Sequence, residues 1–246
     1  MNNAIYSATS GLMNRSRALD VTASNLANAN TAGYKRDRLV TATFGERVAM
    51  RLEAGANAEI GAETHGAIVE EVFTDFSQGV VDNTGRALDF AIIGEGFFSI
   101  ETAGGQEAST RDGSFQLDAE GYLRTMTGGY VLGQGGRIQV GEGEVVIDAA
   151  GVVSAGGQTV DTLAILLPDP ENNNQTKEAD NALSRPEGPG GFTGRIASGK
   201  LERSNVDVGE EMAAMMAASR AFQTCAQAVR ILDAISQKTV NEIGRV

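Results

Sequence analysis

The chain has 246 residues, of which 41% are apolar, enough for one or two domains with their own cores. Its net charge of −12 excludes nucleic acid and anionic membrane surfaces as main partners, because both repel an acidic protein. One cysteine excludes an intramolecular disulfide framework, and one histidine leaves little material for a zinc or iron site. The 31 glycines and 4 prolines favour a turn-rich, largely β architecture.

An apolar residue at every seventh position marks the first predicted helix, over residues 4–29. The repeat consists of Ile5, Leu12, Leu19 and Leu26. This spacing places the four side chains on one stripe of a helix that needs a helical partner. Small residues at Thr9, Ser16 and Ala23 predict a shoulder beside that stripe, where a partner helix can approach closely. The Asn- and Gly-containing run 28–33 should end the helix, because both residue types tolerate the left-handed conformation.

The middle of the chain is predicted to be β. Residues 35–75 show no clean period, and we predict an extended, partly β connector there. Residues 76–198 are typical of an all-β domain built from hairpins. The sequence Asp-Ala-x-Gly occurs at 118–121 and again at 148–151, each time between apolar runs, and predicts two turns. The segment Gly94-Glu95-Gly96 predicts a bend between two buried strands.

A second apolar repeat marks a long helix over residues 207–243. The repeat consists of Val208, Met215, Phe222 and Val229. Asp207 followed by Glu210 is an acidic variant of a capping box, and the helix would be about 55 Å long. Between 212 and 229 only Arg220 is charged, so more than one side of the helix should be covered. One partner helix covers one stripe, and other copies or other proteins must cover the rest.

Candidate chemistry is weak everywhere along the chain. Residues 194–200 have the spacing of a phosphate-binding loop, but Leu201 stands where magnesium needs Ser or Thr, so a strand entering the last helix is favoured. His65 has no Cys or His neighbour and is interpreted as a solvated loop residue. Cys225 is predicted to pack on the inner side of the last helix, without an activating base. We expect no enzyme activity, no metal and no cofactor, and an exposed polar loop over 168–189.

Three separate segments resemble the bacterial flagellar rod and hook protein family. Residues 23–35, A-S-N-L-A-N-A-N-T-A-G-Y-K, are similar to its N-terminal signature, and residues 199–207, G-K-L-E-R-S-N-V-D, are similar to its entry into the last helix. Residues 84–98 contain T-G-R-A-L-D-F-A-I and G-E-G-F-F, which resemble segments of the rod members. The opening Ala4-Ile5-Tyr6 and residues 21–28 are most similar to proximal-rod members, with distal-rod members the close alternative.

The resemblance implies a structural subunit of the flagellar basal-body rod, a tubular drive shaft that transmits torque and encloses the export channel. The implied partners are copies of the chain, other rod subunits, the flagellar export apparatus and the ring or bushing proteins around the rod. It also implies type III export without a cleaved signal and assembly in the periplasm. That location overrules the cytosolic one that the lack of a recognisable signal peptide and of a membrane span would favour. The alternative is a secreted β-rich binding module with helical anchors.

Together these observations predict an α+β protein in which long N- and C-terminal helices pair as a coiled coil and a Gly-rich β domain lies between them. The predicted domains are an N-terminal assembly helix (1–34), the connector (35–75), the β domain (76–198) and a C-terminal assembly helix (199–246). We expect both termini to be poorly ordered in the monomer and to fold on assembly. The predicted assembly-interface residues are Ile5, Leu12, Leu19, Asn25, Leu26, Asn28, Asn30, Gly33, Val208, Met212, Met215, Phe222, Val229, Leu232 and Ile235. The three asparagines either cap helix ends or bridge subunits, with capping favoured for Asn30.

Overall fold

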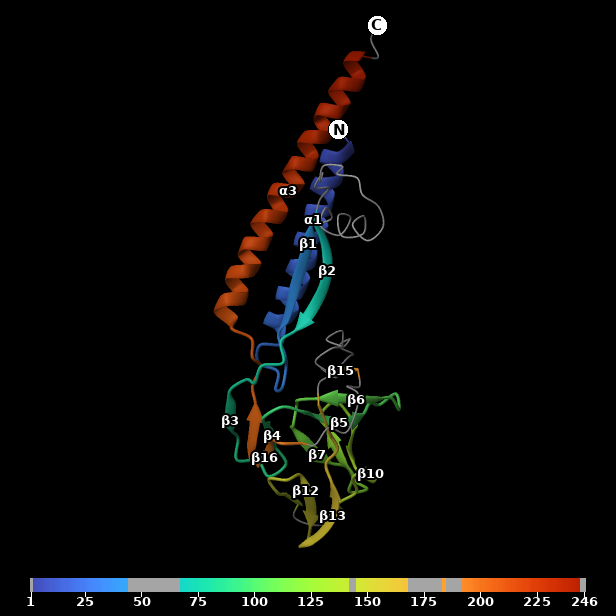
Figure 1. Cartoon of the computed structure of the whole chain (residues 1–246), viewed down its shortest axis with the longest axis vertical. Helices are drawn as coiled ribbons and strands as arrows, with labels where there is room; N and C mark the ends of the chain where they lie inside the picture. Colours follow the sequence, from blue (N-terminus) through green and yellow to red (C-terminus); the bar gives the residue numbers. More distant parts are fainter. Residues whose placement is uncertain (1, 44–66, 142–144, 168–182, 185–191, 244–246) are drawn as a thin grey trace, which may run out of the picture. The chain divides into compact units, whose positions relative to one another are not determined.

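The computed structural model describes residues 2–43, 67–141, 145–167, 183–184 and 192–243. Two compact units divide the chain (Figure 1). The helical unit comprises Met1–Ala27, Asp37–Phe73 and Asp207–Val246, and the β-rich unit comprises Asn28–Arg36 and Thr74–Val206. Two helices flanking a β-rich part confirm the α+β prediction. The β-rich unit includes residues 28–36 and 199–206. From the sequence, these residues were predicted to belong to the terminal and connecting segments.

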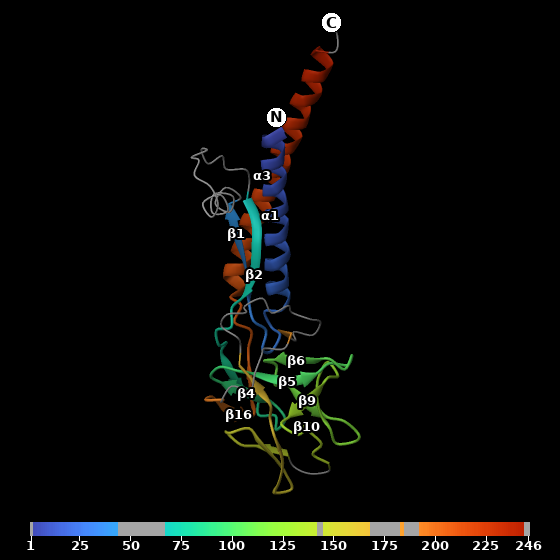
Figure 2. The ribbon, with the colours of Figure 1, turned by 45° about the vertical axis from the view of Figure 1, so that its right-hand side comes forward.

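The helical unit consists of helices α1 (Asn2–Ala27) and α3 (Val208–Ile243) with strands β1 (Asp37–Thr43) and β2 (Ala67–Thr74). Figures 1 and 2 show α1 and α3 side by side and antiparallel, with the β1–β2 sheet beside them. The oxygen Oδ1 of Asp207 accepts hydrogen bonds from the backbone of Gly209 (2.8 Å) and Glu210 (3.1 Å), which confirms Asp207 as the N-cap. Among the described residues, neither helix combines the length and apolarity that a membrane crossing requires.

The side chains of α3 that are at least half-buried include a series at alternating spacings of four and three: Glu211, Met215, Ala218, Phe222, Cys225, Val229 and Leu232. This spacing produces one stripe along the helix. Ser219, Ala221, Ala226 and Ala228 beside this series are half-buried as well. Thr9, Ser16 and Ala23, which were predicted to form a small-residue shoulder on α1, are exposed in this chain, so that shoulder remains a prediction about other chains. A small residue that does meet α3 is Gly11, where a Cβ would lie 3.7 Å from Sγ of Cys225. The covered residues of α1 lie on the flank of its Leu stripe opposite to Thr9, Ser16 and Ala23, because strand β1 also packs on this helix.

The β-rich unit contains one large sheet and several small ones. The large sheet has the order β15-β6-β5-β9-β8-β7, with β10 beside β9 and β14 beside β5, and the others are β11-β12-β13, β16-β4 and β17-β3. The strands are β3 (Val81–Asn83), β4 (Phe90–Ile93), β5 (Phe97–Glu101), β6 (Glu107–Thr110), β7 (Phe115–Leu117), β8 (Leu123–Thr125), β9 (Tyr130–Gly133), β10 (Gly136–Arg137), β11 (Val145–Ile147), β12 (Val152–Ala155), β13 (Gln158–Thr162), β14 (Ile165–Leu166), β15 (Leu183–Ser184), β16 (Arg195–Ser198) and β17 (Lys200–Glu202).

Both predicted Asp-Ala-x-Gly turns are confirmed. Oδ1 of Asp118 accepts a hydrogen bond from the backbone of Tyr122 (2.6 Å), and Leu117 pairs with Leu123 across the hairpin. Oδ1 of Asp148 accepts from the backbone of Val152 at 3.0 Å in the turn between β11 and β12. The glycine of each turn has a positive φ, 79° in the first and 90° in the second. The aspartate therefore fixes the turn and the glycine provides the conformation that closes it.

Local hairpins do not complete the β-rich unit, contrary to the picture of a sheet built only from neighbouring strands. Ile196 pairs with Ile92, and Leu201 pairs with Asp82, so β16 and β17 return to strands more than 100 residues earlier. The bend at Gly94–Gly96 is confirmed and separates β4 from β5, which belong to different sheets. Residues 195–198 and 200–202 form the strands β16 and β17 on either side of Gly199, as the strand interpretation favoured from the sequence requires, and not a phosphate-binding loop.

The core of the β-rich unit joins these sheets through fully buried aromatic and aliphatic side chains. Phe98 and Phe115 meet edge to face, with ring centroids 5.2 Å apart. The buried cluster comprises Phe90, Ile92, Phe98, Phe115, Leu123, Val131, Ile138, Val140, Val145, Ile147, Val153, Leu163, Ile165 and Ile196. Because Ile196 on β16 belongs to this cluster, the core closes only when the chain beyond residue 195 has joined it.

Candidate functional site

The helical unit presents apolar side chains that nothing in the described chain covers. On α1, Tyr6 and Met13 are exposed. On α3, the exposed apolar row consists of two groups, Val208, Met212 and Met216 near the start of the helix and Ile231 and Ile235 about four turns further on, with exposed fractions between 44% and 55%. Large apolar side chains that are exposed to water do not stabilise a monomer. Burying them against another chain stabilises an assembly, so the row is a candidate interface.

The predicted interface residues fall into two groups in the structure. Three of them, Val208, Met212 and Ile235, belong to the exposed apolar row. The half-buried group comprises Leu12, Leu19 and Leu26 on α1 and Met215, Phe222, Val229 and Leu232 on α3. The half-buried residues pack within the helical unit, so the exposed row is the better candidate for contacts with other chains. The side chain of Ile5 lies outside the described residues.

The asparagines at the end of α1 differ in role. Asn25 is buried, and its amide makes a pair of hydrogen bonds to the backbone of Asp37, donating from Nδ2 to the carbonyl (2.8 Å) and accepting at Oδ1 from the amide (2.9 Å). This amide ties the start of β1 to α1. Oδ1 of Asn28 accepts from Oγ1 of Thr31 at 3.2 Å in the turn after the helix. Asn30 is exposed, which keeps it available to a neighbouring chain.

Gly33 serves the β-rich unit rather than an exposed surface. Its φ is 67°, and a Cβ at this position would lie 2.3 Å from the carbonyl carbon of Arg111. The Gly33 amide donates to the carbonyl of Glu202 at 2.8 Å. Both the backbone conformation and the close approach of another backbone require glycine here.

A buried ion cluster lies immediately next to Gly33. Oε1 of Glu202 accepts hydrogen bonds from Nζ of Lys35 (2.7 Å) and from the amide of Gly79 (2.9 Å), and Oε2 accepts from Nε of Arg111 (2.8 Å). All three charged side chains are nearly inaccessible to solvent. One buried carboxylate therefore joins three chain segments that are far apart in sequence.

The two cations of this cluster have further acceptors. Nζ of Lys35 donates to the carbonyl of Ser77 at 2.8 Å. The guanidinium of Arg111 donates to the carbonyls of Gly94 and Gly96, and to that of Ile92 at 3.2 Å. Burial lowers the pKa of Lys35, and the charge and hydrogen bond of Glu202 oppose that effect. The cluster is thus held by directed hydrogen bonds as well as by charge.

Asn205 forms a second connection three residues after Glu202. Its Oδ1 accepts from the amide of Arg36 at 2.7 Å, and its Nδ2 donates to the carbonyls of Asp75 (2.9 Å) and Ser77 (3.1 Å). The amide of Asp75 also donates to the carbonyl of Arg36 at 2.8 Å. One side chain therefore bonds the backbone of both other segments at this end of the β-rich unit.

Two further carboxyl groups, Asp89 and Asp112, are close enough in the β-rich unit to influence each other. Asp89 is 1% exposed, and among the described residues neither of its oxygens accepts a hydrogen bond, although Nη1 of Arg86 lies 3.5 Å from Oδ1. Burial raises the pKa of Asp112; hydrogen bonds from Ser114 oppose the rise and the charge of Asp89 adds to it. The folded protein therefore binds the Asp112 proton more tightly than the unfolded chain does.

Replacing Asp112 by Asn should increase the free energy of unfolding at pH 7 by a few tenths to about 1 kcal/mol. Asn keeps Oδ1, which accepts from the amide (2.9 Å) and hydroxyl (2.7 Å) of Ser114, and removes the charge. Because the pKa is raised on folding, stability from this group is lost as the pH rises through that pKa. Urea unfolding of both proteins should show the difference narrowing from pH 7 to pH 4; a difference independent of pH would contradict the assignment.

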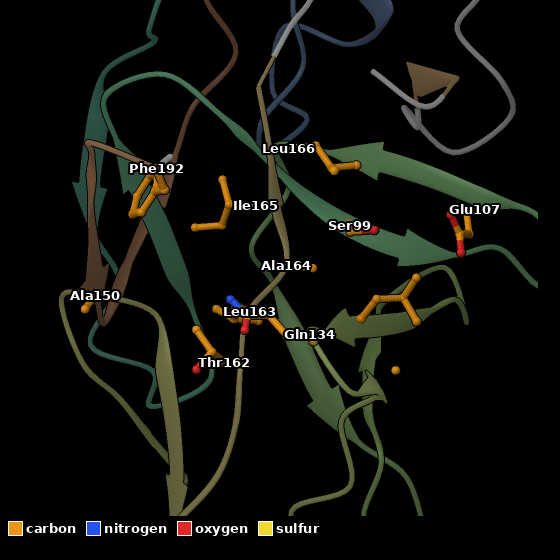
Figure 3. Close-up of a pocket in the computed structure, with 13 residues that line it drawn as sticks. Ser99, Glu107, Gln134, Ala150, Thr162, Leu163, Ala164, Ile165, Leu166 and Phe192 are labelled. Atoms are coloured by element: carbon orange, nitrogen blue, oxygen red, sulfur yellow. The ribbon is translucent and has the colours of Figure 1, made fainter. Parts of the chain in front are cut away.

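A pocket in the β-rich unit offers no catalytic constellation among its described residues. It has a volume of about 610 Å³ and lies beside the segment from Thr162 to Leu166 (Figure 3). Figure 3 shows Ile165, Leu163 and Phe192 among its walls, and among the described lining residues only Glu107 has a titratable side chain. A single carboxylate supplies neither an acid–base pair nor an activated nucleophile.

The sequence interpretation missed the ion cluster and the Asn205 connection. Lys35, Glu202 and Asn205 all lie in the segments that carried the family resemblance. Polar side chains within these extended segments could have suggested that the segments bond to one another through buried polar groups. Arg111 gave no signal, because its carboxylate partner is 91 residues away.

Comparison with known proteins covers both ends and the middle of the chain. Residues 5–35 match the model described as flagella basal body rod protein, residues 91–155 the flagellar hook protein FlgE/F/G D1 domain, and residues 197–242 the flagellar basal body rod FlgEFG protein C-terminal region.

Curated relatives match over nearly the whole length. The chain is 35% identical to the flagellar basal-body rod protein FlgG of Bacillus subtilis, over 98% of this chain and 99% of the relative. It is 32% identical to FlgF of Caulobacter vibrioides, over the full length of both, and 32% identical to FlgF of Escherichia coli, over 95% of each. The chain therefore belongs to the flagellar basal-body rod protein family.

Proposed function

We propose that this chain is a structural subunit of the flagellar rod that joins its neighbours through the exposed apolar row of α3 and the N-terminal part of α1. The observation that carries this proposal is the row itself, Val208, Met212, Met216, Ile231 and Ile235, on a helix that α1 covers on one stripe only. Burying such side chains against other subunits removes apolar area from water, worth about 25 cal/mol per Å².

The pairing of α1 and α3 within one subunit is proposed to be a short antiparallel coiled coil. The three-four spacing of the half-buried residues on α3 supports it, as does the close approach at Gly11. In both Figures 1 and 2, α3 extends beyond the start of α1. We propose that this extension pairs with a neighbouring subunit.

Placing two charges in the exposed row should block entry into the rod. The double substitution Met212→Glu and Met216→Glu keeps good helix-forming residues, so α3 itself should persist. The expected result is an at least tenfold loss of the protein from purified basal bodies, measured by immunoblot, with unchanged helical content by circular dichroism. Burying two carboxylates in an apolar contact costs far more than the contact returns.

A matched control adds the same charge at the same spacing about three turns further along the same helix, where the exposed side chains are polar. Gln223→Glu with Gln227→Glu alters two exposed residues of α3 that are not apolar. This variant should enter basal bodies at the wild-type level. Normal incorporation of the Met212→Glu/Met216→Glu protein would refute the assignment of the row as an assembly surface.

Within the rod, we propose a proximal position, with export by the flagellar type III apparatus, assembly in the periplasm and contacts to the surrounding ring proteins. The opening Ala4-Ile5-Tyr6 and full-length similarity to FlgF of Caulobacter vibrioides support the proximal position. The 35% identity to FlgG of Bacillus subtilis favours the distal rod as the second candidate. Site-specific crosslinking from position 216 in assembled basal bodies would identify the neighbours and separate the two.

A further inference from the structure

The covalent connections between the two units converge on one small set of residues. The chain passes between the units after residues 27, 36, 73 and 206. In the β-rich unit these four passages belong to three segments: 28–36, the start of 74–79, and 199–206. Any force that travels along the covalent chain between the units enters the β-rich unit through these segments.

Two side chains hold the three segments together. Glu202 bonds Lys35 from the first segment and Gly79 from the second, and Asn205 bonds Arg36 from the first and Asp75 from the second. Both of these hub residues belong to the third segment. The connections are buried or half-buried, short and directed, so they resist separation of the segments far better than exposed ion pairs would.

The hub is also anchored to the body of the β-rich unit. Arg111 bonds Glu202 through Nε and the bend at Gly94–Gly96 through the rest of its guanidinium. Its guanidinium carbon lies 5.6 Å from the ring centroid of Phe97 on β5. A pull on any of the three segments is therefore shared with strands of the large sheet.

We propose that Glu202 and Asn205 form a mechanical joint, which makes the β-rich unit turn as one body with the chain segments that lead to the helices. This inference rests on the proposed rod function, because only a rotating rod loads the joint. The residues act by positioning, because they fix three segments with respect to one another.

Hydrogen exchange of the purified full-length protein tests the joint directly. In Asn205→Ala, the Arg36 amide loses its acceptor, so faster exchange there is expected from any model. The joint predicts more: exchange at least about tenfold faster also at Asp75 and Gly33, whose amides bond Arg36 and Glu202 and not Asn205. Amides of β5, such as that of Ile100, should keep their protection.

The matched control is Arg203→Ala, at the position between the two hub residues. The Arg203 side chain is exposed, and among the described residues it makes only a 3.7 Å contact with Asp82, while its backbone bond to Val80 is kept in the variant. Its exchange should match that of the wild type. Faster exchange confined to Arg36 in Asn205→Ala would overturn the joint. If Asn205→Ala lost protection everywhere, Asn205→Asp would be measured in its place. Asp keeps the acceptor for the Arg36 amide and lacks the donor to the carbonyls of Asp75 and Ser77. Unchanged exchange at the Asp75 amide in Asn205→Asp would equally overturn the joint.

A second arm measures swimming speed against medium viscosity in cells whose own copy is replaced by each variant. Asn205→Ala cells should assemble wild-type numbers of basal bodies and lose speed at least twofold more steeply as viscosity rises, whereas Arg203→Ala cells should not. Equal speeds at all viscosities would remove the mechanical role even where exchange shows a released joint. Absence of the wild-type protein from purified rods would instead refute the proposed function. The hydrogen-exchange evidence that the three segments are joined would not be affected.

Discussion

Deletion of residues 2–27 should abolish incorporation of the protein into rods and leave the β-rich unit folded. The deleted segment is the whole of α1, and it removes the cover from the inner stripe of α3 together with Tyr6 and Met13. No residue of α1 belongs to the buried core of the β-rich unit. Immunoblots of purified basal bodies should show no variant protein, while urea unfolding of the purified variant still gives one cooperative transition with β-type circular dichroism.

The end point of the deletion matters. Extending it through residues 28–33 would also remove the turn at Asn28 and Gly33, both in the β-rich unit, and Gly33 contacts Glu202 and Arg111 there. A deletion of residues 2–33 should therefore reduce the stability of the β-rich unit as well, and the two deletions form a matched pair. Normal incorporation of the variant that lacks residues 2–27 would show that α1 is not part of the assembly surface.

Replacing Glu202 by Met should cost about 3 to 5 kcal/mol of unfolding free energy, because removal of one partner leaves buried charges without compensation. Here two cations, Lys35 and Arg111, would remain next to each other without their shared carboxylate. Against a typical domain stability of about 5 to 15 kcal/mol, such a loss brings the protein close to unfolding at 37 °C. Urea denaturation at pH 7 measures it.

The ion cluster offers its own internal check. Lys35→Met in the Glu202→Met background removes one of the two uncompensated cations and should restore part of the lost stability, a coupling that independent sites do not show. Glu101→Gln is the control: its carboxylate meets Arg137 at 2.6 Å, but that arginine is half-exposed. Water solvates such a pair, so the control should lose much less stability. Equal losses in Glu202→Met and Glu101→Gln would contradict the importance of burial.

Local sequence patterns predicted the elements whose cause is local. The seven-residue apolar repeats marked both helices, because a helix repeats every 3.6 residues. The Asp207 cap marked the start of α3, because the first turn of a helix needs a hydrogen-bond acceptor. The Asp-Ala-x-Gly turns were predictable because one aspartate and one glycine satisfy the whole turn. The exposed apolar row was predicted only in part. Val208, Met212 and Ile235 were named from the sequence as interface residues, and Met216 and Ile231 were not.

The sequence was uninformative where a neighbour far away in sequence decided the outcome. The periodicity of α1 gave its apolar stripe, but β1 determined which flank of that stripe was covered, so Thr9, Ser16 and Ala23 became exposed. Asn25 looked like a candidate for subunit contacts, and its bonds to Asp37 instead hold the start of β1. A helical period contains no information about which flank a later strand will occupy.

The sequence by itself determined two helices with apolar seams, a turn-rich β part between them and membership of the rod family, because these depend on residue type and short spacing. Only the tertiary structure decided that Glu202 joins Lys35 across 167 residues and Arg111 across 91, and that Gly33 must be a glycine. The physical reason is that a buried charge can persist only where folding brings its partners to hydrogen-bond distance, and the packing of β3, β4, β16 and β17 sets that distance.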